Sequence, residues 1–153
     1  MQSLRRFISR DEQLWDMGNG GHLYIDPNIL DLIDRYRQRS ELSPESGGFL
    51  TGYYKGNDLH VMDITVPQQG DCYGRNYFNR KDPEHVKKVK QWYIETGGEI
   101  NCLGEWHTHP VPDPYPSGVD TAGWCKFNKN RNGQQAIFLI AGTKSIWVGE
   151  LLC

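Results

Sequence analysis

The segment from Glu99 to Asp120 restricts the possible fold more than any other part of the chain. Residues 99–106 mix β-branched, aromatic and polar side chains without a helical period, which predicts a β-strand. Residues two apart on a strand point to the same face, so His107 and His109 direct both imidazoles toward one point. Pro110 interrupts the strand's hydrogen bonding just beyond them.

A stiff loop then returns the chain toward the two histidines. Residues 111–116 contain three prolines and cannot form a regular element. Ser117 suits a helix N-cap, which places Asp120 in the first helical turn. Two neutral imidazoles and one carboxylate suit Zn²⁺, and three protein ligands leave the fourth tetrahedral position to water. The sequence therefore predicts one catalytic zinc ion held by His107, His109 and Asp120.

Each half of this pattern also has a simpler interpretation. Ser-x-x-Asp is a capping-box variant, and His-x-His is common on exposed strands. The complete pattern is His-x-His-Pro, with seven residues between His109 and Ser117, followed by Ser-x-x-Asp. It resembles the signature of the JAMM (MPN or Mov34-type) zinc metallopeptidases. The resemblance implies that His107, His109 and Asp120 bind zinc and that Ser117 supports the oxyanion.

The same resemblance extends to residues 45–52, Glu45-x-x-Gly48-x-Leu50-x-Gly52, which are similar to the family strand that carries the catalytic glutamate. It implies that Glu45 is the general acid/base. Glu105 is a rival, because it lies two residues before His107 and shares its strand face. Geometry alone allows Glu105 to be the base or a fourth ligand, and Asp113 is a weaker candidate in the proline loop. The resemblance favours Glu45.

Two further stretches are candidates for substrate contact. Glycines at 47 and 48 let another chain pass close to the backbone, so an extended tail is expected to lie along the strand from Gly48. Residues 67–82 read as a long loop rich in aromatic residues and arginine, which suits substrate or partner contact, although core packing by Phe78 is the alternative. The predicted substrate-binding residues are Gly47, Gly48, Phe49, Tyr77 and Phe78.

The remaining chain predicts a single α+β domain over residues 1–153. The expected elements are strand 22–26, helix 27–39, strands 48–54 and 59–66, a helix from 82 to Gly97, strand 99–106, helix 117–128, and strands 135–140 and 145–150. This β-α-β-β-α-β-α-β-β order indicates a mixed, mostly antiparallel sheet flanked by helices, as in the MPN (JAMM) fold. His85, in the first turn of the second helix, is expected to be exposed. Residues 1–21 form an N-terminal extension, either an extra strand or a partner-binding arm.

Composition and charge restrict the classes of partner and the cellular compartment that we expect. The formal net charge of −2 gives no support for a nucleic-acid partner. The chain has no apolar run long enough to cross a membrane, and its N-terminus lacks the apolar core of a signal peptide. Four cysteines without a Cys-x-x-Cys pair are expected to be reduced thiols, so a cytoplasmic protein is predicted.

The resemblance also implies an activity. Its family members hydrolyse the bond after the C-terminal tail of ubiquitin or a ubiquitin-like protein. Residues 104–110, Gly-Glu-Trp-His-Thr-His-Pro, follow the aromatic loop of residues 67–82. Together these stretches are similar to stand-alone bacterial members found in antiphage (CBASS and related) operons with E1/E2-like enzymes. Eukaryotic relatives usually have an aromatic residue where Glu105 stands and Ser where Thr108 stands, which argues against a proteasome or signalosome subunit.

We therefore expect a zinc-dependent, deubiquitinase-like isopeptidase or peptidase that reverses conjugation. Its expected partner is a ubiquitin-like protein or a conjugated target with an extended C-terminal tail. A CBASS nucleotidyltransferase and an E1/E2-like enzyme are the named candidates. The alternatives are a peptidase that trims precursor tails of sulfur-carrier proteins, and a non-catalytic MPN or zinc-binding scaffold.

Overall fold

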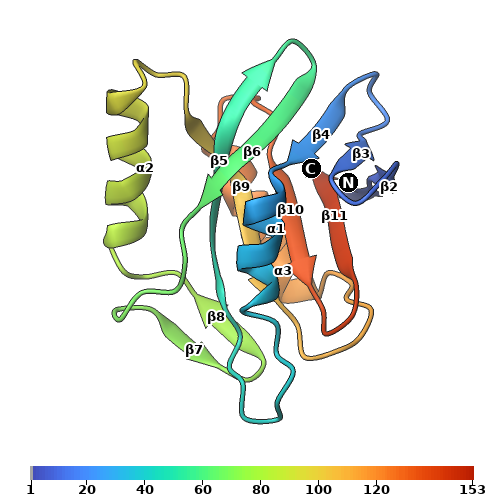
Figure 1. Ribbon diagram of the computed structural model, residues 1–153, viewed down its shortest axis with the longest axis vertical. Helices are drawn as coiled ribbons and strands as arrows, with labels where there is room; N and C mark the ends of the chain where they lie inside the picture. Colours follow the sequence, from blue (N-terminus) through green and yellow to red (C-terminus); the bar gives the residue numbers. More distant parts are fainter. Residues whose placement is uncertain (1) are drawn as a thin grey trace.

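A curled, mixed nine-stranded sheet forms the body of the protein, as seen in a computed structural model that describes residues 2–153 (Figure 1). A separate two-stranded sheet projects beside it. The elements are β1 (Ser3–Arg6), β2 (Ile8–Ser9), β3 (Leu14–Asp16), β4 (His22–Ile25), α1 (Pro27–Asp34), β5 (Gly47–Lys55), β6 (Asp58–Ile64), β7 (Cys72–Gly74), β8 (Tyr77–Asn79), α2 (Glu84–Glu95), β9 (Asn101–Thr108), α3 (Gly118–Lys129), β10 (Ile137–Ala141) and β11 (Ile146–Leu152).

The strand order of the large sheet is β1-β11-β10-β9-β5-β6-β4-β3-β2. The β9–β10 and β4–β6 pairs are parallel and the other pairs are antiparallel, so the predicted mixed, mostly antiparallel sheet is confirmed. Strands β1 and β2 lie at opposite edges of this order, yet only Phe7 separates them in the sequence. The sheet must therefore curl until its two edges adjoin. The Phe7 side chain is buried at this junction, and its N–H donates to the Val148 carbonyl at 2.8 Å.

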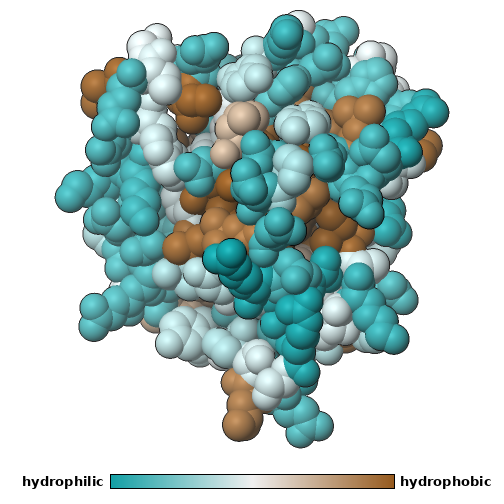
Figure 2. All heavy atoms as spheres, in the orientation of Figure 1, coloured by the Kyte–Doolittle hydropathy of each residue, from teal (hydrophilic) through white to brown (hydrophobic). Residues whose placement is uncertain are grey.

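The helices cover different parts of the sheet. Helix α1 begins at the Asp26 cap, with Pro27 in its first turn, and buries Ile29 and Ile33. Side chains of β10 alternate between two hydrophobic clusters, since Leu139 packs with the α1 side and Phe138 with Trp124 of α3. Among the described residues, none of the helices has both the length and the apolar character needed to cross a bilayer. The face shown in Figure 2 is mostly hydrophilic, with hydrophobic residues gathered near its centre.

The element order differs from the expected one by five additional strands. Three of them, β1 to β3, come from the N-terminal segment, so of the two alternatives for that segment the structure shows added strands. The other two form the β7–β8 hairpin inside the stretch expected to be a loop. Strands this short carry too few residues for a period to be recognised. The end of α1 also differs from the prediction, because this helix ends at Asp34 and not near residue 39.

The early end of α1 has a clear cause in long-range contacts. The Arg37 guanidinium donates to the carbonyl of Gly142 at 2.7 Å. The Gln38 side chain is buried and donates to the carbonyls of Ser43 and Arg75. These bonds draw the chain away from the helix axis, and no local pattern announces them.

Two expectations about single residues were wrong. His85 is fully buried, because its ring is hydrogen-bonded between Thr65 and Asp71. Cys125 of α3 and Cys153 form a disulfide pair with Cα atoms 6.3 Å apart, so only Cys72 and Cys102 of the four cysteines are free thiols.

Candidate metal centre and its cleft

Three side chains converge at the end of β9. The Nε2 atoms of His107 and His109 lie 3.0 Å apart. His107 Nε2 is 3.2 Å from Asp120 Oδ1, and His109 Nε2 is 3.1 Å from Asp120 Oδ2. A tetrahedral ion with bonds of about 2.0–2.1 Å separates its ligand atoms by roughly 3.3 Å. The three groups therefore fit a single Zn²⁺ ion.

The local sequence explains this convergence. His107 lies in β9, and the His109 N–H continues the pairing with the Ala141 carbonyl of β10 at 3.0 Å, so both rings keep the strand's alternation. Across the proline loop, Ser117 caps α3. Its Oγ accepts from the Asp120 N–H, and its own N–H donates to Asp120 Oδ2. The capping box and the ligand role of Asp120 are thus compatible, since the cap fixes the carboxylate that faces the histidines.

Asp120 is electrostatically suited to bind a cation. Burial opposes its ionisation, but hydrogen bonds from His107 and His109 outweigh this effect and hold the pKa of Asp120 well below the usual range. The group is therefore a carboxylate at neutral pH, as a zinc ligand must be.

Glu45 lies in the same cleft and is a different kind of carboxylate. Its side chain is only 6% exposed, and it has no hydrogen-bond or ion-pair partner among residues 2–153. Burial raises the pKa of Glu45 to about 7, the charge of His109 lowers it, and the charge of Asp120 raises it. A carboxyl group that exchanges a proton near neutral pH is suited to acid/base catalysis.

Glu105 also lines the cleft but is already neutralised. Its carboxylate forms an ion pair with Arg80. The Arg80 guanidinium lies 3.7 Å from the centre of the Phe49 ring, in a cation–π arrangement. Glu105 is thus held in place by a cation, whereas Glu45 is unpaired, and this difference favours Glu45 as the base.

The cleft has a volume of about 720 Å³ and runs between the β7–β8 hairpin and α3. Gly48, Tyr77 and Phe78 line it, as expected for substrate-binding residues. Gly47 lies beneath Phe78, whose Cδ1 would be 2.8 Å from an added Cβ, and Phe49 is buried beneath Arg80. These two residues support the wall and do not line it.

The structure offers two strand segments for the expected pairing with an extended tail. Strand β5 is paired with β9 from Gly47 onward but with β6 only from Leu50 onward, so its first residues have no β6 partner. Strand β8 lines the cleft and has only β7 as its partner among the described strands. Strand β8 therefore offers a free edge for backbone pairing with a tail, in addition to the start of β5.

Ser117 and Asp113 have different positions. Ser117 lines the cleft, and its hydroxyl oxygen accepts the capping bond while its proton remains free to be donated. Asp113 is exposed and accepts a hydrogen bond from Ser145 Oγ at 2.8 Å, so the structure does not bring it to the metal ligands.

Sequence reasoning missed a buried set of residues behind the site. Thr108, between the two histidines, accepts from the Ser46 N–H at 2.9 Å and donates to Gln38 Oε1 at 2.9 Å. The Gln38 amide donates in turn to the Arg75 carbonyl of the hairpin turn at 2.8 Å. This network joins the histidine strand to the segment that carries Glu45. No signal at the level of single residues marks Gln38, because its partners lie far away in the sequence.

Comparison with known proteins relates this site to a family. Residues 31–148 match the family profile described as prokaryotic homologues of the JAB domain. Three curated relatives carry the name CD-NTase/cGAS isopeptidase. The Escherichia coli protein is 36% identical over 129 residues, covering 84% of this chain and 81% of its own length. The Vibrio cholerae protein is 37% identical over 126 residues, covering 80% and 78%. The Pseudomonas aeruginosa protein is 30% identical over 127 residues, covering 82% and 80%.

A solved structure supports the same fold. The solution structure of a protein from Desulfitobacterium hafniense superimposes with a TM-score of 0.54 and 18% identity, covering 77% of this chain and 73% of that one. At this level of identity the likeness concerns the fold alone.

Proposed function

The chain belongs to the prokaryotic JAB domain family, and from this membership we propose that it is a zinc-dependent isopeptidase that releases a protein from a conjugate. The observation that carries the proposal is the triangle of His107, His109 and Asp120 ligand atoms, with edges of 3.0–3.2 Å, in one cleft with the unpaired Glu45. A scaffold without catalysis has no need for a buried carboxylate beside such a triangle.

The residues of the cleft divide the hydrolysis between them. Zn²⁺ held by His107, His109 and Asp120 would lower the pKa of water to about 7 and polarise the scissile carbonyl. Glu45 takes a proton from the attacking water as the new C–O bond forms. It then gives that proton to the nitrogen as the C–N bond breaks, so the amine leaves neutral. The Ser117 hydroxyl donates a hydrogen bond to the oxyanion and keeps its proton.

The substrate we propose is a conjugate in which an extended C-terminal tail is joined to a lysine amine. The relatives named CD-NTase/cGAS isopeptidase favour a CD-NTase tail over a ubiquitin-like one. The shape of the cleft suits such a tail, since it is bounded by β8 on one side and by α3 on the other. Binding along β8 would add backbone hydrogen bonds to the contacts of the cleft.

The test is a matched set of conjugates. A CD-NTase tail and a ubiquitin tail are each joined to the same carrier peptide, once through a lysine side chain and once as a linear fusion. We expect the isopeptide-linked CD-NTase tail to be cleaved fastest, and 1,10-phenanthroline to stop cleavage until Zn²⁺ is restored. Preferred cleavage of the linear fusion would instead support a precursor-trimming peptidase, and cleavage that resists the chelator would contradict a zinc enzyme.

A further inference from the structure

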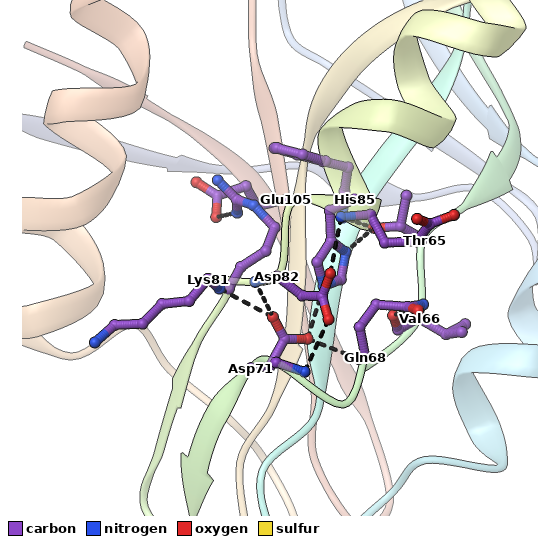
Figure 3. A network of polar contacts seen from close by, with 12 residues as sticks. Thr65, Val66, Gln68, Asp71, Lys81, Asp82, His85 and Glu105 are labelled. Atoms are coloured by element: carbon purple, nitrogen blue, oxygen red, sulfur yellow. Dashed lines mark hydrogen bonds and ion pairs between the residues drawn. The ribbon is translucent and has the colours of Figure 1, made fainter.

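A buried hydrogen-bond network centred on Asp71 lies at the root of the β7–β8 hairpin (Figure 3). Asp71 Oδ1 accepts from the backbone N–H groups of Lys81 and Asp82, each at 2.9 Å. Its Oδ2 accepts from the Gln68 N–H and from His85 Nε2, each at 2.7 Å. Asp71 immediately precedes β7, and Lys81 follows β8 closely. One carboxylate therefore closes both ends of the hairpin.

His85 connects this carboxylate to the body of the protein. Its Nδ1 lies 2.6 Å from Thr65 Oγ1, and Thr65 Oγ1 also accepts from the Phe49 N–H of β5 at 2.8 Å. In the tautomer with its proton on Nε2, the imidazole donates to Asp71, and its Nδ1 accepts from the Thr65 hydroxyl. In this arrangement every polar group of the network has a partner. The hydrogen bonds run without interruption from β5 through Thr65, His85 and Asp71 to the hairpin.

The network is a buried attachment at the root of the hairpin, at the opposite end from the bond between Gln38 and Arg75. Thr65 and His85 are fully inaccessible to solvent, and Asp71 is nearly so. His85 is the one buried residue of α2, whereas the hydrophobic Val89 and Trp92 are half-buried, so an imidazole is the most deeply buried side chain of this helix. The Thr65 carbonyl also accepts from Trp106 Nε1 at 2.9 Å, directly beside His107. The hairpin root is thus tied to both strands that carry the site.

The hairpin touches the cleft at its other end. The Gly74 carbonyl accepts from the Glu45 N–H at 2.8 Å, and residues 76–80 line the cleft. A displacement at the root would therefore move the wall of the cleft, while the segment of Glu45 stays bonded to β9 through the N–H and carbonyl groups of Ser46, which pair with Thr108. Because strand β7 and strand β8 have only three residues each, their own pairing offers little resistance to such a displacement.

From these contacts we infer that Asp71, His85 and Thr65 are positioning residues, which hold the β7–β8 hairpin as a preformed wall for the substrate tail. The inference deepens the proposed function and rests on it for the identity of the tail. The proposed catalytic groups do not touch this network. The proposed zinc ligands are positioned by the end of β9 and the first turn of α3. The loss of the network is therefore expected to weaken substrate capture far more than metal binding.

The first experiment needs no substrate. His85→Phe keeps a ring against Phe49, which now lies 6.2 Å away and edge-on, but removes both nitrogens. Hydrogen exchange followed by mass spectrometry is expected to show at least tenfold faster exchange in residues 68–85 of this variant, with unchanged exchange in β9 and β10. Thr65→Ser, which keeps the hydroxyl, is expected to exchange like the parent protein. Unchanged exchange over residues 68–85 in His85→Phe would overturn the inference.

The second experiment separates positioning from general destabilisation. Leu23→Ala empties a buried position in β4, away from the network, and serves as a control matched for the loss in melting temperature. With the isopeptide-linked tail conjugates, His85→Phe and Asp71→Asn are expected to raise KM by roughly tenfold or more, with kcat within about threefold and one zinc per chain retained. Leu23→Ala is expected to leave KM unchanged.

The outcomes distinguish the two proposals. If Leu23→Ala raises KM as much as His85→Phe does, the network is only structural and the inference is wrong. If the parent protein cleaves none of the conjugates, the proposed function falls, while the exchange measurement still decides whether the network holds the hairpin.

Discussion

At the scale of single residues, the site separates two carboxylates by their surroundings. Glu105 is paired with Arg80 and stays in reach of water, whereas Glu45 is buried without a partner. Placing an unpaired carboxylate out of water costs free energy, and a nearby cation or a transferred proton relieves that cost. This difference favours Glu45 over Glu105 as the acid/base of the proposed reaction.

Exchange of each carboxylate for an amide tests this assignment. We expect Glu45→Gln to lower kcat by at least about 10³-fold with zinc still bound, because a general base contributes roughly 10²–10⁴-fold. Glu105→Gln, the matched control, is expected to lose less than about tenfold, through the altered Arg80 contact. Zinc content is measured in both variants by mass spectrometry. The opposite ranking of the two variants would show that Glu105 is the base.

Glu45 also predicts how the stability of the metal-free protein depends on pH. Burial raises the pKa of Glu45 to about 7 from its model-compound value of 4.5, so between these values the folded state binds more protons than the unfolded state. This contribution to stability is present below about 4.5 and is lost as the pH rises through about 7. Glu45→Gln is therefore expected to stabilise the metal-free protein at pH 8 by on the order of 2 kcal/mol relative to its effect at pH 4.5. Urea titrations at both pH values measure the difference, and an equal effect at both would contradict it.

Individual residues were predictable where a short-range pattern defined them. His107 and His109 share a face because they alternate on a strand, and Asp120 follows from the cap at Ser117. In contrast, the buried polar side chains behind the site have partners tens of residues away. His85 was expected on the surface because it lies in the first turn of a helix, and only the fold reveals its bonds to Thr65 and Asp71.

At the scale of elements, the start of β5 is restricted by its neighbours. A Cβ at Gly48 would lie 2.0 Å from the Thr65 carbonyl oxygen, and this backbone atom cannot move without disturbing the Trp106 bond. Glycine is therefore required here for close packing of strands and not for an unusual backbone angle. The same close packing of Gly48 against Thr65 keeps the Thr65 hydroxyl in hydrogen-bonding distance of the Phe49 N–H.

Alanine at this glycine is expected to be costly. We expect Gly48→Ala to lower the free energy of unfolding by at least roughly 2 kcal/mol, because backbone must shift to admit the methyl group. Gly123→Ala, in the middle of α3 with nothing within 4 Å of the added Cβ, is expected to raise it by about 1 kcal/mol through helix propensity. Urea denaturation of the two variants measures both signs. A neutral Gly48→Ala would mean that β5 and Thr65 separate easily.

Most elements were predictable because they are long and periodic. The β5–β6 hairpin, β9, α3 and β10 all lie where the patterns indicated, within a few residues. The β7–β8 hairpin was not predictable, since it depends on Asp71 closing its root and on Glu45 meeting its turn. The end of α1 was missed for a similar reason, because Gln38 is drawn inward by the carbonyls of Ser43 and of the distant Arg75.

At the scale of the whole molecule, the curled sheet is joined at one residue. Phe7 lies between the edge strands β1 and β2 and is 4% exposed, whereas the next residue, Ile8, is 68% exposed. The junction therefore has one side chain that fills the interior and one that faces solvent. Nothing in the sequence pattern distinguished the two, because both are large and hydrophobic.

The different burial of Phe7 and Ile8 allows a direct test of the junction by substitution of each residue. Phe7→Ala is expected to cost about 3–5 kcal/mol of unfolding free energy, as for other buried phenylalanines. Ile8→Ala is expected to change it by less than about 0.5 kcal/mol. Chemical denaturation of both variants gives the comparison, and similar losses would show that the edges do not meet at Phe7.

The junction at Phe7 also sets an order of events during folding. Ser3 pairs with Leu152, so the first strand of the chain finds its partner only when the last one has formed. Closing a loop of nearly the whole chain carries a large entropic cost, and contacts so distant in sequence slow the search for the native state. The strands from β4 to β10 can assemble earlier, and the N-terminal segment then completes the sheet. In a nascent chain β1 would thus stay without its partner until β11 has been synthesised.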